Sequence, residues 1–475
     1  MATQTTALPF ANVDAPYRAI LRLAAPTVVA MLSQSIVNEV DVIFFSRLPC
    51  PESSNGQAAL LPALIVVWLF GGSLSAISVG TQALTARRYA EREPHKAGAV
   101  VANSAVFCLL AGGAFSLVGY LLLPFLFGLM IKVPEVRAVA IDYTRWRMLG
   151  VTSMAMTMAI KAFFDGIGRT HVHLVAAVVM NILNVALCWI FVFGAAGAPR
   201  MGVVGAGMAA FIATWVGLFI MLLYAVLVRA EFRPFRPSNL SFKLTGDILR
   251  LSIPASFATI VMMFGFGLFS AVVGRLDSEN VTRAGAMVGV CGVHEAVNSA
   301  ATTDIVEVLK LTFTACLAFG TAAATLVGQS LGARRPDDAT RFGWASVRLG
   351  LMIFGVVGLC EGVLFTRPII AFITQSDAVR AAALFPMHIV GVVTPIIAVA
   401  MILSEALFGA GNTKFVAVAQ FALVFGCLLP LAVLLGVVFK MSLVGIWVAA
   451  CVYFIFAAIT MTLKFRQGTW KTIIL

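Results

Sequence analysis

The heptapeptide ILRLAAP at residues 20–26 recurs as ILRLSIP at residues 248–254, and Arg47-Leu48 recurs as Arg275-Leu276 at the same spacing of 228 residues. After residue 276 the spacing between matching positions increases by 14 residues, so the second half carries an insertion there. The chain is therefore an internal duplication. Each copy holds six long apolar segments, and because six is even, both copies enter a bilayer in the same orientation, as parallel repeats do.

Composition indicates a protein whose solvent is the lipid bilayer. Of the 475 residues, 61% are hydrophobic and only 11% are charged, which is too little polar surface for a soluble globule. A segment of about 20 apolar residues can cross the hydrocarbon core. We predict an all-α polytopic membrane protein with twelve transmembrane helices in two parallel six-helix repeats. The predicted spans are 18–47, 57–86, 97–128, 136–163, 169–194, 203–229, 246–275, 299–328, 339–366, 378–408, 413–438 and 442–465.

The distribution of basic residues predicts the orientation of these spans. The net charge of +12 comes from Lys and Arg gathered at alternate helix ends, which is the positive-inside bias and does not suggest a nucleic-acid partner. Residues 1–17 contain no apolar core, so we expect no cleavable signal peptide. We predict a multi-pass inner-membrane protein with both termini in the cytoplasm. Its predicted parts are an N-terminal segment (1–17), an N-lobe (18–229), an inter-lobe linker (230–245), a C-lobe (246–465) and a C-terminal tail (466–475).

The first predicted helix carries a polar stripe. Gln34, Asn38 and Asp41 stand at positions i, i+4 and i+7, which places them on one helix face. A carboxylate inside the bilayer costs about 3 kcal/mol on insertion scales, so an intramembrane Asp is a candidate functional residue. The alternative is a structural acid held by a neighbouring amide or by water. Glu39 lies about 200° around the helix from Asp41, so only one of the two can face a given cavity.

A second stripe and two prolines complete the candidates from the first repeat. Asn181, Asn184 and Cys188 share one face of the fifth predicted helix, and packing of this face on the first helix would bury Asp41 among amides. Pro26 lacks an N–H and frees the carbonyl of the residue four positions earlier, so it is a candidate hinge, and Pro254 repeats it. The alternative is that both prolines only shape their helices.

Charged residues of the second repeat offer a weaker candidate. Asp304 and Glu307, followed by Lys310, stand three residues apart at the start of the eighth predicted helix. They could form an ion or substrate site, or simply a solvated helix end with an acid–base pair on one face. Four other charged residues near predicted helix ends are interpreted as interfacial: Lys161, Asp165, Glu361 and Glu405.

Cysteines and histidines give no sign of a metal or redox centre. The eight cysteines show no CxxC spacing and the five histidines are dispersed, so we expect no metal, no cofactor and no hydrolytic site. Cys50 and Cys291 both fall in predicted outer loops, where an oxidising periplasm could join them.

Several motifs together resemble the MATE family of multidrug and toxin extrusion transporters. These are Pro26 followed by VDVIFFSRL at residues 40–48, the turns GRT at 168–170 and GNT at 411–413, and LVGQSLGA at 326–333. The resemblance covers nearly the whole chain. It implies two bundles of six helices and alternating-access exchange of an organic cation for protons or sodium.

Carrying over the family's ion site residue by residue favours protons. Asp41 and Asn184 match the expected Asp and first Asn, but Cys188 replaces a second Asp and Ala210 stands where a Thr is expected. In the branch with acidic second-lobe residues, carboxylates would stand about where Met262 and Ile397 occur here. Because alkali cations need several oxygen ligands, we predict proton rather than sodium coupling through Asp41.

The resemblance also sets the expected partners and the alternatives. We expect an amphipathic, cationic small-molecule substrate, lipid around a functional monomer, and Glu39 as the candidate for a second proton. A flippase for lipid-linked sugars is the alternative in the same superfamily, but it needs a strongly basic cavity. Arg145 and Arg147, interpreted as near the outer end of the fourth helix, and Lys310 are the few basic residues within helices. A membrane-embedded enzyme or receptor would leave the internal repeat unexplained.

Overall fold

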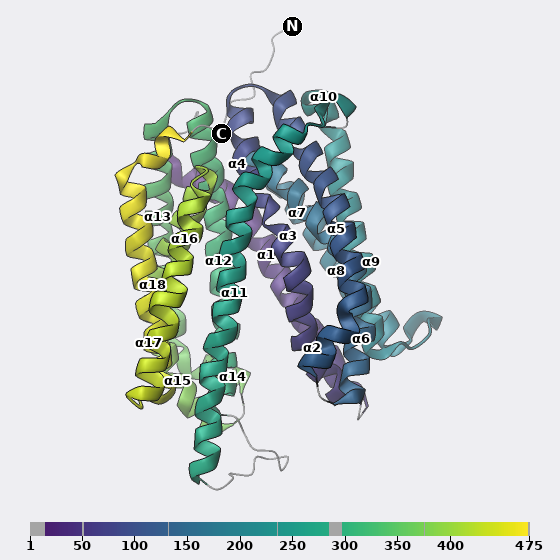
Figure 1. Cartoon of the computed structure of the whole chain (residues 1–475), viewed down its shortest axis with the longest axis vertical. Helices are drawn as coiled ribbons and strands as arrows, with labels where there is room; N and C mark the ends of the chain where they lie inside the picture. The colour runs from purple at the N-terminus through teal and green to yellow at the C-terminus, as the bar shows by residue number, and fades with distance from the viewer. Residues whose placement is uncertain are drawn as a thin grey trace. The chain divides into compact units, whose positions relative to one another are not determined.

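A computed structural model describes residues 15–49, 52–131, 133–234, 236–284, 297–374 and 376–473, except for a few side chains inside helices. Across these residues the chain is helical and contains no strand, so the predicted fold class is confirmed (Figure 1). Ten of the described helices are long and apolar enough to cross a membrane. The other two predicted spans correspond to α1 (Pro16–Ser46) and to α6 (Pro134–Leu149) with α7 (Val151–Gly166). The protein is therefore a multi-pass membrane protein.

The chain divides into two compact units. The first contains the described residues up to Ser256 together with Ala324–Ala339, and the second contains Phe257–Ala323 and Thr340–Ile474. Besides α1, α6 and α7, the first unit is built from these elements: α2 (Glu52–Val67), η2 (Trp68–Gly72), α3 (Ser73–Ser75), α4 (Ile77–Ala90), α5 (Pro94–Met130), α8 (His171–Phe193), η3 (Ala195–Gly197), α9 (Gly202–Leu227), α10 (Arg229–Phe232) and η4 (Pro237–Asn239). Helix α11 (Phe242–Ala284) begins in the first unit and continues in the second.

The second unit repeats the helical pattern with more interruptions. Helix α12 (Val297–Gly332) lies mostly in the second unit, and its last turns belong to the first. The remaining elements are α13 (Pro336–Leu359), η5 (Cys360–Leu364), α14 (Thr366–Ile373), α15 (Asp377–Gly409), α16 (Thr413–Leu423), η6 (Val424–Leu428), α17 (Leu429–Val433), η7 (Leu434–Val438), α18 (Ser442–Gln467) and η8 (Thr469–Thr472). At the start of α12, the Asp277 carboxylate accepts bonds from the backbone N–H groups of Asn298 and Ser299, and so caps the helix.

Several predicted spans are not continuous α-helices. The second, ninth and eleventh spans contain the π-helical segments η2, η5, η6 and η7, and the fourth breaks at Gly150. A π-helical turn carries one extra residue and changes which face the following side chains present. The periodicity of an apolar segment does not reveal such a turn.

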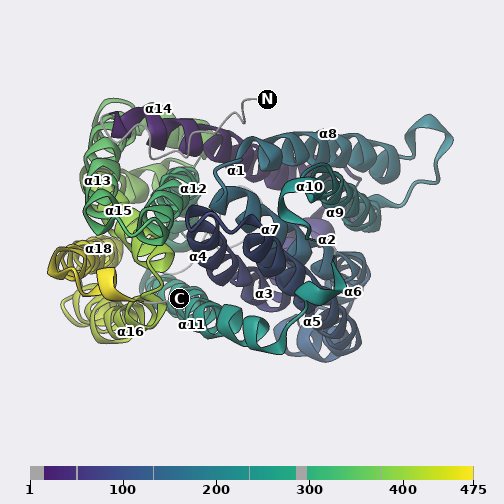
Figure 2. The same ribbon diagram turned by 90° about the horizontal axis from the view of Figure 1, so that it is seen from above.

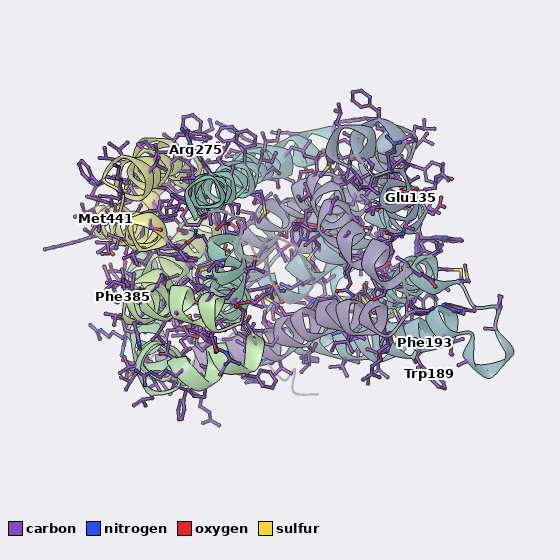
Figure 3. All side chains as sticks on the ribbon, turned by 90° about the horizontal axis from the view of Figure 1, so that it is seen from below. Glu135, Trp189, Phe193, Arg275, Phe385 and Met441 are labelled. Carbon is purple, nitrogen blue, oxygen red and sulfur yellow. The ribbon has the colours of Figure 1, made fainter. Side chains whose placement is uncertain are left out.

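The side chains on the outside of the helices differ from those in the protein interior. Large apolar residues such as Trp189 and Phe385 are more than half exposed and lie on the outside of their helices (Figure 3), as lipid-facing residues do. Inside the first unit, buried rings pack edge to face, for example Phe163 on Phe232. The view in Figure 2 shows α8 alongside both α1 and α9.

The last turns of α12 are tied to the first unit by polar side chains. The Gln82 amide donates to the Thr325 hydroxyl at 2.9 Å, and Thr325 donates to the carbonyl of Asp165 at 3.1 Å. One turn later, the Gln329 amide donates to the carbonyl of Gly166 at 2.7 Å. The last two of these bonds are accepted by carbonyl groups in the final turn of α7, where no further helical turn supplies N–H donors.

Candidate ion-coupling site

The two predicted polar stripes of the first unit face each other. The Asn181 amide of α8 donates to the Ser33 hydroxyl of α1 at 2.8 Å. Two turns farther along, the Cys188 thiol donates to Oδ1 of Asp41 at 3.6 Å. Cys188 also lies 3.9 Å from the Asn184 side-chain oxygen. Helix periodicity is what places these five side chains in one seam.

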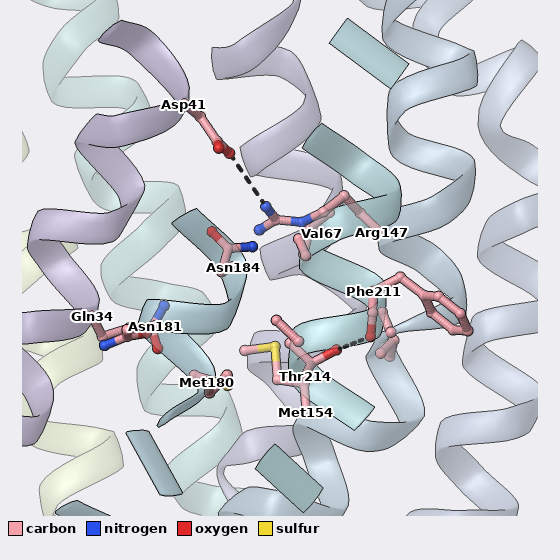
Figure 4. A pocket seen from close by; sticks show the side chains of 14 residues that line it. Gln34, Asp41, Val67, Arg147, Met154, Met180, Asn181, Asn184, Phe211 and Thr214 are labelled. Carbon is pink, nitrogen blue, oxygen red and sulfur yellow. Dashed lines mark hydrogen bonds and ion pairs between the residues drawn. The ribbon is translucent and has the colours of Figure 1, made fainter. Parts of the chain in front are cut away.

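Asp41 lies at one end of this seam and is only 8% exposed. Besides Cys188 it meets two side chains from α6, which are one turn apart. The Tyr143 hydroxyl donates to Oδ2 of Asp41 at 3.3 Å, and Nη1 of Arg147 lies 3.9 Å from the same oxygen (Figure 4). Nη1 of Arg147 also donates to the Tyr143 hydroxyl at 3.2 Å. Both carboxylate oxygens of Asp41 are therefore engaged by protein groups.

The structure shows where the charge of Arg147 lies. Its guanidinium points into the first unit and supplies the counter-charge of Asp41. The long aliphatic stem of an arginine can carry the charged group well away from its own backbone position, so a place in the helix does not fix where the charge lies. At about 4 Å and an effective dielectric constant of about 20, two unit charges attract by about 4 kcal/mol before the cost of desolvation.

A small cavity extends from Asp41 along the seam. Its volume is about 80 Å³, which is room for a few water molecules. The cavity is lined by Gln34, Asp41, Val67, Arg147, Gly150, Val151, Met154, Met180, Asn181, Asn184, Ala210, Phe211, Ala213 and Thr214. Oδ1 of Asn181 is buried there and has no hydrogen-bond partner among the described residues. The cavity is thus lined by amides beside one neutral ion pair.

Some of the predicted site residues lie elsewhere or outside the described structure. Gln34 lines the cavity, whereas the side chains of Asn38 and Glu39 lie outside the described residues, as do Cys50 and Cys291. Tyr143, Arg147 and Ser33 were missed by the sequence analysis. The spacing of Tyr143 and Arg147, one helical turn apart on a predicted membrane helix, is a pattern that could have found the first two.

The candidate hinges lie inside long helices. Pro26 is in the interior of α1 and Pro254 in the interior of α11. Pro26 also borders a second cavity of about 650 Å³, with Arg22, Arg169, His171 and Tyr224 among its other lining residues. Open space beside a proline is where a helix can bend without displacing packed neighbours.

Asp304 and Glu307 stand one turn apart on α12 and have different surroundings. Glu307 accepts a 2.7 Å bond from Lys310 at a partly exposed position. Oδ2 of Asp304 has no hydrogen-bond partner in the described part of the chain.

Three residues interpreted as interfacial are in fact buried. Lys161 donates to Asp165 at 2.6 Å, and the two are 8% and 1% exposed. Glu361 is 7% exposed. Each lies near a helix end in the sequence, but neighbouring helices cover that end, and an apolar sequence pattern does not show this.

Comparison with known proteins gives a consistent result. The MatE family model matches residues 26–190 and 286–434. The chain is 25% identical to "Probable multidrug resistance protein NorM" of Caulobacter vibrioides over 95% of this chain and 92% of that protein. It is also 25% identical to "Multidrug resistance protein PmpM" of Pseudomonas aeruginosa, over 79% and 76% of the two chains.

Solved structures share the fold. One is described as the "Outward-facing conformation of a multidrug resistance MATE family transporter of the MOP superfamily", with a TM-score of 0.82 and 22% identity over 95% of both chains. A second, from Pyrococcus furiosus, has the same TM-score, identity and coverage, and is described as a transporter in which "Reverse polarity of binding pocket suggests different function".

Proposed function

Because the chain belongs to the MatE family, we propose that it is a multidrug efflux antiporter that exports amphipathic organic compounds, cations in particular, in exchange for protons. The relatives named as multidrug resistance proteins support the efflux function. The observation that carries the proton coupling is the buried Asp41 with Arg147 beside it. Small-molecule transport by this family requires no enzymatic site.

The environment of Asp41 suits a proton better than a sodium ion. A sodium ion bound to Oδ2 would have to share that oxygen with the guanidinium of Arg147, which repels it. Of the other two neighbours, Tyr143 already donates its hydroxyl to that oxygen and Cys188 offers sulfur, whereas hard cations take oxygen ligands. A proton needs only one carboxylate oxygen.

Protonation of Asp41 would couple to the substrate through charge. With Asp41 ionised, the carboxylate and the guanidinium of Arg147 are together neutral, so a cationic compound can approach the lobe. Protonation from outside removes the negative charge and leaves the positive charge of Arg147 uncompensated, which repels the cation and favours its release. Loss of the proton toward the cytoplasm restores the neutral pair. The driving ion thus stabilises one state of the site more than the other, as coupling requires.

The proposal is tested in inverted membrane vesicles containing the protein, with a fluorescent organic cation outside. We expect an acid-inside gradient to drive uptake in the complete absence of sodium. Asp41→Asn serves as the control for uptake that does not use this site. A strict requirement for a sodium gradient, with no uptake driven by protons, would overturn proton coupling.

A further inference from the structure

Glu361 is a buried acid of the second unit that the proposed function leaves unused. It stands on the π-helical turn η5, between α13 and α14. Two hydroxyls from other helices reach its carboxyl group. The Thr312 hydroxyl of α12 lies 3.3 and 3.1 Å from the two carboxyl oxygens, and the Thr394 hydroxyl of α15 lies 3.1 Å from Oε1.

The backbone is shaped to bring these groups together. The π-turn shifts the helix register at Glu361, and such turns are frequent at functional sites. Next to it, Gly362 packs directly against Gly391 of α15, so closely that a Cβ on either glycine would overlap the other backbone. This close approach of two helices is what places Thr394 against the carboxyl group.

Within the described part of the chain, Glu361 has no cationic partner. No ion pair is formed by its carboxyl group there, and both of its hydrogen-bond partners are neutral hydroxyls. Near Glu361, the packed elements carry the buried Cys316 thiol of α12 and His388 of α15, while Arg367 of α14 is exposed. The same elements also carry the Glu307–Lys310 pair of α12 and the Asp377–Arg380 pair of α15, whose charges are paired with each other. His388 bonds the carbonyl of Gly362 and lies 3.4 Å from the Thr366 hydroxyl, so it is held by other groups.

The hydroxyl of Thr394 has one proton but two neighbours that can accept it. Its oxygen lies 3.1 Å from the carbonyl of Val390 and 3.1 Å from Oε1 of Glu361. If Thr394 donates to Val390, the contact with Glu361 is a hydrogen bond only when the carboxyl group carries the proton. The geometry therefore accommodates both protonation states of Glu361 without moving an atom. A carboxylate left buried and unpaired is costly, so this acid gains from binding a proton.

The polar cluster has no counterpart in the first repeat. At the repeat spacing of 242 residues, Thr312 and Glu361 correspond to Phe70 and Gly119, which offer no polar side chain. Asp41, in turn, corresponds to Phe269 at the spacing of 228. Asp41 and Glu361 therefore each stand at a position where the other half of the duplicated chain has no acid.

We propose that Glu361, with Thr312 and Thr394, is a second proton-binding site, located in the second unit. This proposal rests on the proposed proton-coupled function. On substrate binding Glu361 gives up its proton to water, and on substrate release it takes one up, so that its site and Asp41 together return two protons for each exported cation. Exchange of two protons for one monovalent cation moves one net charge, and transport then responds to membrane potential as well as to pH.

The first test counts protons. Purified full-length protein in a weakly buffered solution is titrated with a fluorescent organic cation while released protons are measured. Wild type is expected to release twice as many protons per bound cation as Glu361→Gln or Asp41→Asn. The matched control is Glu135→Gln, the same change at an exposed position in the first turn of α6 (Figure 3). This control is expected to release as many protons per bound cation as wild type.

The outcomes separate this proposal from the proposed function. If Glu361→Gln releases as many protons as wild type, the second site is wrong and proton coupling stands. If wild type releases no protons, proton coupling itself, and with it the proposed function, is wrong. In proteoliposomes without a pH gradient, a membrane potential should accelerate wild-type exchange and leave Glu361→Gln unaffected, and equal acceleration of both would also overturn the second site.

A second measurement uses only the wild-type protein and therefore does not depend on the folding of a variant. Dicyclohexylcarbodiimide adds the O–H of a protonated carboxyl group across one of its C=N bonds and rearranges to a stable N-acylurea. Peptide mass spectrometry of the treated wild-type protein should find this adduct at Glu361 at acidic pH and progressively less as the pH rises. An adduct yield at Glu361 that does not change with pH, or no adduct at any pH, would contradict a proton-binding role.

Discussion

Arg147 changes what the acid of the first unit can do. An isolated Asp41 would be an anionic site that attracts any small cation, whereas Asp41 beside a guanidinium is neutral when ionised and positive when protonated. In the proposed mechanism, protonation of Asp41 acts by leaving the charge of Arg147 without a counter-charge.

Removing one member of the pair should lower the stability of the folded protein more than removing both. Arg147→Gln leaves the Asp41 carboxylate buried without its counter-charge, so we expect a lower melting temperature at neutral pH. Because the Arg147 side chain is about one quarter exposed, the decrease in the free energy of unfolding should be smaller than the roughly 3–5 kcal/mol that is typical of fully buried pairs. Asp41→Asn with Arg147→Gln leaves no unpaired carboxylate, so it should recover part of the loss.

Thermal melting of wild type, both single variants and the double variant measures this coupling. An interaction free energy of about 0.5–3 kcal/mol is expected for residues in contact. Strict additivity of the two single effects would show that Arg147 and Asp41 do not interact in the folded protein.

Restoring oxygen ligands should introduce a response to sodium. Cys188 contacts Asp41 and Ala210 lines the same cavity, so Cys188→Asp with Ala210→Thr adds oxygen atoms where the family's ion site has them. Arg147 still opposes a bound cation, and we therefore expect a larger sodium response when Arg147→Gln is combined with both changes. Sodium-dependent uptake in inverted vesicles is the measurement. If ion preference is the same in all combinations, the ion site has been assigned to the wrong residues.

Among the helices, α1 combines the candidate acid with a candidate hinge. Pro26→Ala supplies an N–H that can donate to the carbonyl of Arg22 and removes the ring that clashes with it, so the helix becomes harder to bend. We expect slower transport with cation binding and melting temperature retained. Pro254→Ala makes the same change in α11 and should have the smaller effect, because that helix carries no counterpart of Asp41. Equal transport rates for wild type and Pro26→Ala would exclude a hinge at that position.

Helix existence and helix faces could be predicted, but helix interruptions could not. Apolar length located the described spans, and the spacing of Asn181, Asn184 and Cys188 placed them on the face toward α1. The π-turn at Glu361 depends on how α13 packs against α15, which is tertiary information. For the same reason Glu361 was interpreted as interfacial, although Thr312 and Thr394 reach it from helices distant in the sequence.

For the whole molecule, the internal repeat was the most informative sequence feature. It predicts two like halves of six helices, and helical solved structures with a TM-score of 0.82 share the fold. The site was less predictable. Asp41 follows from its helix face, but Arg147 does not, because its long side chain decides where its charge lies.

Orientation in the membrane is a further prediction about the whole chain. If basic residues mark the cytoplasmic side, a single cysteine placed in 230–245 should react with an impermeant thiol reagent only from the cytoplasm. A cysteine placed in 277–297 should react only from outside. All native cysteines must first be replaced, because Cys291 falls in the second segment. The reverse labelling pattern would invert the orientation.

In the proposed function, protonation of Asp41 drives exchange. The most direct measurement is exchange of an organic cation by purified protein in liposomes after a pH jump, for wild type, Asp41→Asn and Glu39→Gln, with thermal melting to confirm folding. We predict that Asp41→Asn loses driven exchange but still binds the cation weakly, and that Glu39→Gln keeps most of it. Driven exchange that survives in Asp41→Asn and disappears in Glu39→Gln would contradict the claim and assign coupling to the opposite face of α1.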